Sequence, residues 1–187
     1  MYKPLRGVYA IISTPFYPNG ALDEASLHRL VEATVVTGVD GITVLGVAGE
    51  VQKLSDAERR RVVEVVMETV ADRVPVIVGT SREGTDATVA ASREAEALGA
   101  AGVMVAPPTF LQPGPALTDH FRRIGEAIEI PIVLQDYPPV NGVTLSPRAM
   151  AELVDAVPAI ATIKLEDPPT PQRIGQTLQL TGDRVTI

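Results

Sequence analysis

A lysine interrupts an apolar run near the end of the sequence. Residues 159–169 read AIATIKLEDPP, so Lys164 follows a run of small and aliphatic residues that otherwise suits a buried strand. Burial disfavours an ammonium group, and we expect it to lower the pKa of this lysine toward neutrality. A neutral amine can attack a carbonyl group and form a Schiff base, which activates 2-keto acids. In the alternative, Lys164 extends to solvent or pairs with Glu166 or Asp167.

A glycine-bracketed turn is the second candidate. Residues 45–54 read LGVAGEVQKL and follow another apolar run. A sharp turn of this kind can leave consecutive backbone N–H groups free to bind a carboxylate or keto oxygen. The expected binding residues are Gly46, Val47, Ala48, Gly49 and Glu50. The alternative is an ordinary tight connection between a strand and a helix.

The third candidate is QDYPP, residues 135–139. Side chains alternate along a strand, so Gln135 and Tyr137 are expected on one face and Asp136 on the other. If the first face lines a barrel, Gln135 and Tyr137 point toward the site, where a tyrosine hydroxyl could relay protons. In the alternative, Tyr137 is a packed ring at the rim of the barrel.

Short β-type segments alternate with helical ones and must position these residues. The β-type segments are rich in valine and isoleucine on both faces, as expected for parallel strands covered by helices on both sides. Active sites of such proteins lie at the carboxyl ends of the strands, which is where all three candidates fall. The expected strands are residues 7–13, 41–46, 75–80, 102–107, 131–137 and 159–165, with the start of a seventh at 184–187.

Helix boundaries can also be read from the sequence. Ser55 and Glu58 have the spacing of a capping box, and two other hydroxyl residues precede a proline that suits the first helical position. Glycines are typical where a helix ends. The predicted N-caps are Ser55, Thr85, Ser146 and Thr170, and the predicted helix-ending glycines are Gly38 and Gly99.

Repeated βα units fit either a doubly wound sheet or a (β/α)8 barrel of the TIM type. A doubly wound nucleotide-binding sheet should carry a glycine fingerprint after its first strand, and STPFYPNG has none, which favours the barrel. A barrel needs about 250 residues. The chain supplies about six units, so we expect a single, incomplete barrel domain over residues 1–187, truncated within a seventh strand. Its open strand edges are expected to pair with another chain or with residues beyond this sequence.

Composition narrows the class of protein. The 187 residues are 45% hydrophobic, carry a net charge of -7 and include no cysteine. Dispersed basic residues argue against nucleic acid, and no apolar stretch approaches the ~20 residues of a membrane span. The sequence therefore predicts a cytoplasmic protein with a small-molecule partner, no disulfide and no metal site. His28 and His120 are expected on helix surfaces, and residues 59–61, an arginine run, on a solvated helix face.

Together these segments resemble the dihydrodipicolinate synthase / N-acetylneuraminate lyase family, Schiff-base barrels of the class I aldolase superfamily. The resemblance rests on GVYAIISTPF, DGITVLGVAGEVQKLSDAERRRVV, PVIVGTS, EAEALGAAGVMVAPP, IPIVLQDYPP and IKLEDPPTP. It implies Lys164 as the imine-forming residue, pyruvate or a related 2-keto acid as its partner, and no cofactor. It also implies a homo-oligomer, either a dimer or a tetramer.

Several positions depart from the family pattern. Val47 and Ala48 stand where family synthases have two threonines, and Gln135 stands where the family tyrosine is expected. The arginine that binds the synthases' second substrate aligns with Val140, and the glutamate after the lysine is replaced by Leu165. The second relay tyrosine is missing within residues 107–110.

These departures argue against dihydrodipicolinate synthesis. They favour a lyase, aldolase or dehydratase for a sugar-acid-like 2-keto acid, with Tyr137 or Gln135 in proton transfer beside Lys164. The rival hypothesis is a catalytically silent 2-keto acid binding or regulatory protein, or an inactive fragment.

Overall fold

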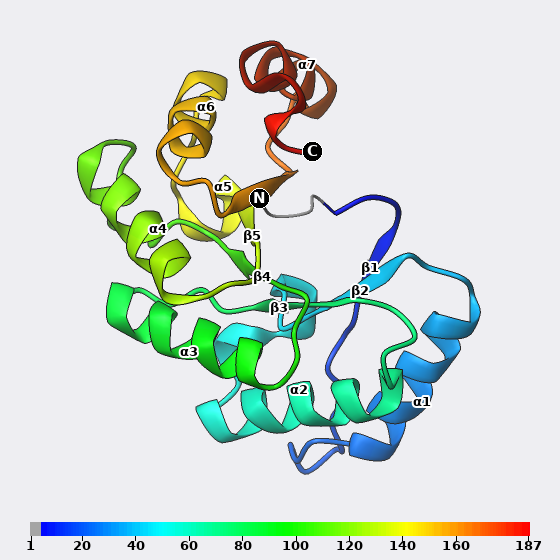
Figure 1. The fold of residues 1–187 in the computed structure, drawn as a ribbon. Helices are drawn as coiled ribbons and strands as arrows, with labels where there is room; N and C mark the ends of the chain where they lie inside the picture. The colour runs from blue at the N-terminus through cyan, green and yellow to red at the C-terminus, as the bar shows by residue number, and fades with distance from the viewer. Residues whose placement is uncertain (1–4) are drawn as a thin grey trace. The chain divides into compact units, whose positions relative to one another are not determined.

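The computed structural model describes residues 5–187, which form two compact units. The N-terminal unit comprises Arg6–Gly79 and Ala97–Gly102, and the C-terminal unit comprises Leu5, Thr80–Glu96 and Val103–Ile187. Strands and helices alternate along the chain in both, which makes each unit α/β (Figure 1). A single domain over residues 1–187 stays a prediction, and its first four residues lie outside the described part.

The strands of the N-terminal unit are parallel and lie in chain order. They are β1 (Tyr9–Ile11), β2 (Gly41–Val44) and β3 (Val76–Gly79), and β2 pairs with both neighbours. Every residue of β2 and β3 is buried, which is why both segments are apolar on both faces. Helices α1 (Glu24–Val36) and α2 (Asp56–Val70) lie side by side in this unit.

Helix α2 begins with the predicted capping box. The Ser55 backbone N–H donates to Glu58 Oε2 at 2.8 Å, and the Glu58 N–H donates to Ser55 Oγ at 3.3 Å. The two bonds satisfy backbone donors that the first turn leaves without helical partners. The predicted glycines at helix ends are also confirmed, because Gly38 and Gly99 have φ of 83° and 94°.

The expected solvated face of the arginine run is wrong at Arg59, whereas the Arg61 side chain is 40% exposed. The side chain of Arg59 is only 18% exposed, and its Nη2 donates to Val51 O at 2.9 Å. Arg61 reaches from α2 to α1, where its Nη2 lies 2.8 Å from Glu24 Oε2. These two guanidinium groups therefore connect neighbouring segments of the N-terminal unit.

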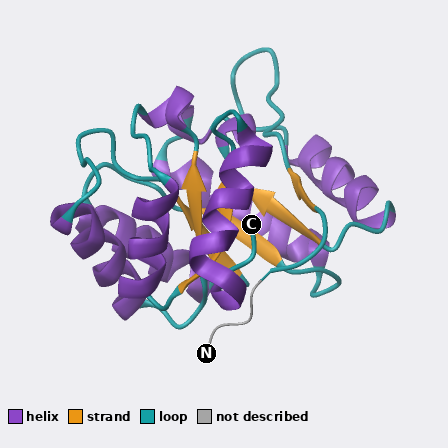
Figure 2. Cartoon of the chain, turned by 90° about the horizontal axis from the view of Figure 1, so that it is seen from above, coloured by secondary structure: helices purple, strands orange, loops and turns teal. Residues whose placement is uncertain are grey.

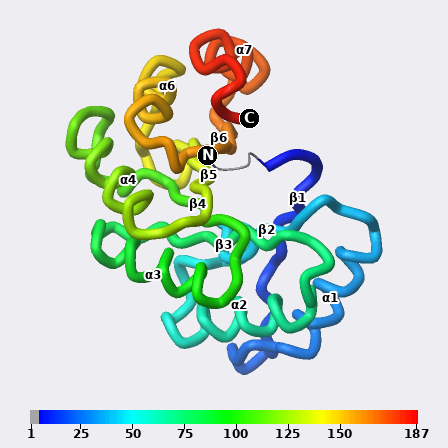
Figure 3. The backbone as a smooth tube through the Cα atoms, viewed as in Figure 1, coloured from blue at the N-terminus to red at the C-terminus, as the bar shows by residue number. Residues whose placement is uncertain are grey.

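The strands of the C-terminal unit are also parallel and lie in chain order, as the labels of Figure 3 show. Figure 2 distinguishes the strands of the chain from its helices by colour. The strands of this unit are β4 (Gly102–Val105), β5 (Ile132–Asp136) and β6 (Ile160–Leu165), and the register of the last pair sets Gln135 opposite Lys164. The helices of this unit pack around the strands, with α6 against α7. The helices are α3 (Thr85–Ala97), α4 (Pro115–Ala127), α5 (Pro138–Asn141), α6 (Pro147–Ala156) and α7 (Thr170–Thr181).

The predicted N-caps of this unit are correct at one helix and displaced at two. Ser146 caps α6, where its hydroxyl accepts from Ala149 N at 3.1 Å. Thr170 is the first residue of α7, and Pro169 occupies the cap position. Thr85 is likewise the first residue of α3, and its hydroxyl lies 2.9 Å from His120 Nδ1. The Thr85 hydroxyl therefore serves a contact between helices.

The expected seventh strand does not form as predicted. Gly182–Arg184 is a short 3-10 helix, and only Thr186 pairs with β6, through an isolated parallel bridge to Thr162. Ile163 N donates to Thr186 O at 2.8 Å, and the Leu5 N–H donates to Thr162 Oγ1 at 3.3 Å. The middle of this β6 edge is thus paired from within the chain, which corrects the expectation of an outside partner there.

A glycine on β3 accommodates an unusual backbone at the end of β2. Leu45 has φ of 55°, in the left-handed region that aliphatic residues rarely adopt. Its carbonyl oxygen lies so close to Gly79 that a Cβ added there would be 2.1 Å away. Only glycine leaves room for this approach, so Gly79 fixes the direction in which the chain leaves β2.

We predict that Gly79→Ala lowers the free energy of unfolding by about 3 kcal/mol or more, because the backbone of Leu45 must move. Gly175→Ala is the matched control, since a Cβ at this α7 position meets nothing within 4 Å. We expect it to stabilise by about 0.5–1 kcal/mol, the helix preference of alanine over glycine. Denaturant unfolding measures both variants, and equal stability of Gly79→Ala and the unchanged protein would contradict the packing argument.

Candidate active site

Lys164 lies on β6 and carries a half-buried amine. Its side chain is 30% exposed, and Nζ lies 3.3 Å from Glu166 Oε1. The pairing with Glu166, one of the alternatives that the sequence left open, is therefore present. An amine at the carboxyl end of a strand, with a carboxylate beside it, combines a nucleophile with a proton acceptor.

Gln135 lies next to Lys164 across the strands. Its side chain is buried at the end of β5, and its Nε2 donates to Glu166 Oε2 at 2.9 Å. The parallel register that sets Gln135 opposite Lys164 brings both side chains to the same carboxylate. The structure thus joins two of the three predicted catalytic residues through Glu166.

Glu166 was not predicted as a site residue. Its backbone N–H donates to Asp136 O at 3.0 Å, which continues the contact between the β5 and β6 segments beyond the end of β6. The signal was present in the sequence, since residues two apart on an extended segment share a face, and Glu166 is two residues after Lys164. The side chain is 29% exposed, so solvent or a small molecule can reach this carboxylate.

Tyr137 is not joined to this group. Strand β5 ends at Asp136, and Tyr137 precedes the short helix α5 with φ -137° and ψ 72°. The ring is half-buried, and its hydroxyl makes no hydrogen bond with any residue in the described range 5–187. The strand alternation that predicted a shared face with Gln135 therefore ends one residue too early to orient this side chain.

A buried ion-pair network lies behind the same strand ends. Arg173 of α7 places Nη2 2.8 Å from Asp136 Oδ2 and Nη1 3.0 Å from Asp167 Oδ2. Burial raises the pKa of the Asp136 carboxyl, and the charge of Arg173 opposes this shift. No local pattern predicted the network, because its members come from β5, the segment after β6, and α7.

The predicted binding turn forms a short 3-10 helix in the N-terminal unit. Val47–Gly49 is this helix, and its closing bonds run from Gly49 N to Gly46 O and from Glu50 N to Val47 O, both at 3.0 Å. The backbone N–H groups of Val47 and Ala48 have no partner within residues 5–187. Both residues are exposed, and the hydrogen bonds that close the turn do not use these two donors.

Contacts with β1 and its extension hold this turn in shape. The hydroxyl of Thr14, which is buried, donates to Gly49 O at 2.7 Å. A Cβ at Gly49 would lie 3.1 Å from Ile12 O, a close approach that favours glycine. Glu50 is left-handed with φ 55°, and its carboxylate pairs with Lys53 at 2.7 Å. The Glu50 side chain therefore faces Lys53 in solvent, and the Glu50 backbone N–H and C=O are both engaged, with Val47 O and Lys53 N.

His120 corrects the expectation of a surface histidine. It is 1% exposed on α4, with Nδ1 2.9 Å from Thr85 Oγ1 and its ring edge-on to Phe121. Burial lowers its pKa, so the neutral ring is favoured. Its packing is structural, since it joins α3 to α4. His28 is exposed as expected.

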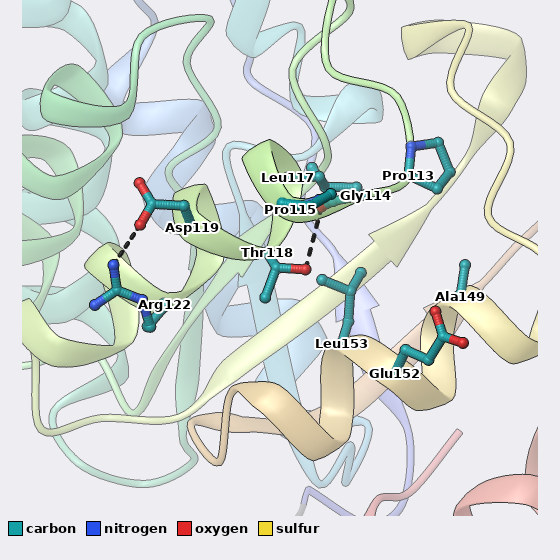
Figure 4. A pocket seen from close by; sticks show the side chains of 10 residues that line it. All are labelled: Pro113, Gly114, Pro115, Leu117, Thr118, Asp119, Arg122, Ala149, Glu152 and Leu153. Atoms are coloured by element: carbon teal, nitrogen blue, oxygen red, sulfur yellow. Dashed lines mark hydrogen bonds and ion pairs between the residues drawn. The ribbon is translucent and has the colours of Figure 1, made fainter.

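A pocket between α4 and α6 is separate from these residues (Figure 4). It encloses about 540 Å³ and takes no wall from Lys164, Gln135 or Glu166. Its lining residues are Pro113, Gly114, Pro115, Leu117, Thr118, Asp119, Arg122, Ala149, Glu152 and Leu153.

Within the described residues, no group of three or more histidine, aspartate and glutamate side chains is arranged to hold a metal ion. Nor is any helix there long and apolar enough to cross a bilayer.

Two curated relatives are similar over most of the chain. The 4-hydroxy-tetrahydrodipicolinate synthase of Pelobacter propionicus is 36% identical over 97% of this chain and 62% of its own length. The L-2-keto-3-deoxyarabonate dehydratase of Azospirillum brasilense is 35% identical over 96% of this chain and 59% of its own length. The chain thus spans about three fifths of the length of these relatives.

A solved structure and a family model agree with these relatives. The chloride-inhibited dihydrodipicolinate synthase of Acinetobacter baumannii, complexed with pyruvate, has a TM-score of 0.90 and 29% identity. That match covers 96% of this chain and 61% of the other. The model of the dihydrodipicolinate synthetase family matches residues 4–187. A match of this extent means that the chain belongs to the dihydrodipicolinate synthetase family.

Proposed function

We propose that this protein is a Schiff-base lyase that acts on a 2-keto acid, with Lys164 as the nucleophile. The observation that carries the proposal is the carboxylate of Glu166, which lies 3.3 Å from Lys164 Nζ and 2.9 Å from Gln135 Nε2. The amine adds to the keto carbon, water leaves, and the resulting imine draws electrons from the adjacent carbon. No separate cofactor is needed for that step.

Proton transfer is assigned to Glu166. The ammonium of Lys164 must lose a proton before it attacks, and Glu166 Oε1 is the carboxylate oxygen beside it. The Gln135 amide donates to the other oxygen and holds the carboxylate in place. Gln135 therefore orients the base, because an amide does not itself take up protons at neutral pH. Tyr137 remains a candidate for a second proton transfer or for water positioning.

The turn from Gly46 to Glu50 is proposed to bind the substrate carboxylate. The free N–H groups of Val47 and Ala48 support this role, because paired backbone donors in a turn bind anions without a charged side chain. Neither side chain offers a hydroxyl, so this turn holds a substrate but relays no proton.

The reaction proposed is cleavage of a C–C or C–O bond in a sugar-acid-like 2-keto acid, not dihydrodipicolinate synthesis. Val47 and Ala48 lack hydroxyl groups, and Val140 offers no basic contact for a second substrate. The name of the Azospirillum relative, a 2-keto-3-deoxy sugar acid dehydratase, supports this class of substrate. The names of other relatives describe the synthase reaction, so the choice rests on these side chains.

The whole protein is proposed to be a (β/α)8 barrel of the TIM type that assembles as a homo-oligomer, a dimer or a tetramer. The parallel strands of both units and the TM-score of 0.90 to a family structure support the barrel. The cytoplasmic location expected from the sequence stays a prediction.

The first test is covalent trapping of the imine. Pyruvate with borohydride should add the mass of one reduced pyruvyl group to the protein, and Lys164→Ala should abolish the adduct because no other amine occupies this position. Intact-mass measurement followed by peptide mapping reads the result. An adduct that persists in Lys164→Ala would refute the assignment, and an imine that leads to no product from any 2-keto sugar acid would favour the silent binding protein.

The second test addresses the base. We expect Glu166→Gln to keep the hydrogen-bonding shape but to slow turnover of a 2-keto sugar acid by roughly 100-fold or more, the usual loss when a general base is removed. Glu152→Gln is the control, because Glu152 pairs with Arg148 on the surface of α6. Steady-state rates with unchanged helical content would separate a chemical loss from unfolding, and a full rate in Glu166→Gln would refute the role.

The third test addresses the turn. Gly49→Ala should raise the pyruvate concentration needed for half-maximal trapping, because the added Cβ presses on Ile12 O and tilts the turn. The maximal trapping rate should change little, since the amine and its base are untouched. Gly84→Ala is the control, with its Cβ 3.8 Å from Ala87. An unchanged concentration dependence would remove the turn from the site.

A further inference from the structure

Arg173 contacts three segments near the proposed base. Its Nη2 lies 2.8 Å from Asp136 Oδ2 and donates to Leu145 O at 2.6 Å, while Nη1 lies 3.0 Å from Asp167 Oδ2. The end of β5, the segment before α6 and the segment between β6 and α7 thus meet at one guanidinium group. Its planar fork can bind partners in several fixed directions at once.

The ion pairs of Arg173 add little to the stability of the fold. The Asp136 side chain is 0% exposed and that of Arg173 is 12% exposed, so both charges lose most of their hydration. Within the described residues, Asp136 Oδ1 and Arg173 Nε are buried without a hydrogen-bond partner. Apolar side chains of similar size would join these segments without such losses. What an ion pair with several hydrogen bonds adds is one defined geometry.

Glu166 lies between the two points that Arg173 holds. Its N–H donates to the carbonyl oxygen of Asp136, and Asp167 is the next residue of the chain. The guanidinium therefore restrains the backbone on both sides of Glu166, while the Glu166 carboxylate extends to Lys164 and Gln135.

We infer that Arg173 is a positioning residue that holds the Glu166 carboxylate between Lys164 and Gln135. The inference rests on the proposed role of Glu166 as the base. Arg173 touches neither the amine nor the reacting atoms, and acts through the segment that it fixes. A displacement of about 1 Å in such a group can cost up to about 100-fold in rate.

Helix α7 has other attachments, so the loss of Arg173 need not detach it. Thr177 and Thr181 are buried on its inner face, and the helix packs against α6. Arg184, just beyond its end, pairs with Asp155 and donates to Thr181 O at 2.7 Å. Arg184→Gln is therefore a matched control, because this arginine of the same region forms no hydrogen bond or ion pair with residues 164–167.

The test is a double-mutant cycle of Arg173→Gln and Glu166→Gln in the full-length protein, with the rate of pyruvate trapping by borohydride as the first measurement. Arg173→Gln should slow trapping about 10-fold to 100-fold. The double variant should be no slower than Glu166→Gln, because Arg173 acts only through that carboxylate. Trapping by Arg173→Gln at the unchanged rate, or losses that multiply in the double variant, would overturn the inference.

A second measurement does not depend on activity. The side-chain amide of Gln135, observed by nitrogen-15 NMR, should shift in Arg173→Gln in the same direction as in Glu166→Gln and stay in place in Arg184→Gln. If the Gln135 amide signal does not move in Arg173→Gln, the inference is overturned. This outcome can be read even if the unchanged protein forms no pyruvate adduct, in which case the proposed function fails separately. If Arg173→Gln does not fold, Arg173→Lys replaces it. The lysine keeps the positive charge but lacks the planar guanidinium group, so we expect the same shift of the Gln135 amide signal.

Discussion

The parallel register of β5 and β6 is the constraint on which the candidate site depends. It sets Gln135 opposite Lys164, and so brings an amide and an amine to the same carboxylate. A slip of one residue would turn one of these side chains to the opposite face and leave Glu166 with a single partner. The backbone bond from Glu166 to Asp136 and the Arg173 network extend the same register beyond the last paired residues, where the strands no longer hold each other.

Each unit holds its proposed site residues in a different way. The C-terminal unit relies on side chains, whose positions follow from strand pairing and buried charge. The N-terminal unit relies on backbone, because Leu45 and Glu50 adopt left-handed conformations on either side of the Gly46–Gly49 turn. Such conformations cost energy unless neighbouring structure requires them, and here Gly79 and Thr14 supply that support.

The sequence could predict those features that depend on neighbours in the chain. Short apolar segments marked every strand, and Ser55 and Ser146 marked two helix starts, because these signals are local. His120 could also have been predicted as buried, since it shares a helical stripe with Leu117, Phe121 and Ile124. Strand ends were less predictable: residues 7–13 were expected as a strand, but only Tyr9–Ile11 pair regularly.

Features that depend on distant residues could not be read in this way. In the sequence, Arg173 looks like any surface arginine of a helix. Its buried ion pair is with Asp136, which is 37 residues earlier in the chain. The free amide donors of Val47 and Ala48 depend on the local turn and could be anticipated, whereas the strain at Leu45 could not. That strain becomes visible only with Gly79, a residue on another strand.

The approach of Gly79 to Leu45 also has an evolutionary consequence. Because no side chain fits at position 79 while the chain turns as it does after β2, the glycine cannot change first without harm. A lineage that replaces the glycine must first change the backbone course at the end of β2. Position 79 should therefore tolerate side chains only in those family members whose second strand ends with a different backbone course. Variation of the turn after β2 would then be limited by β3, a strand whose residues are all buried.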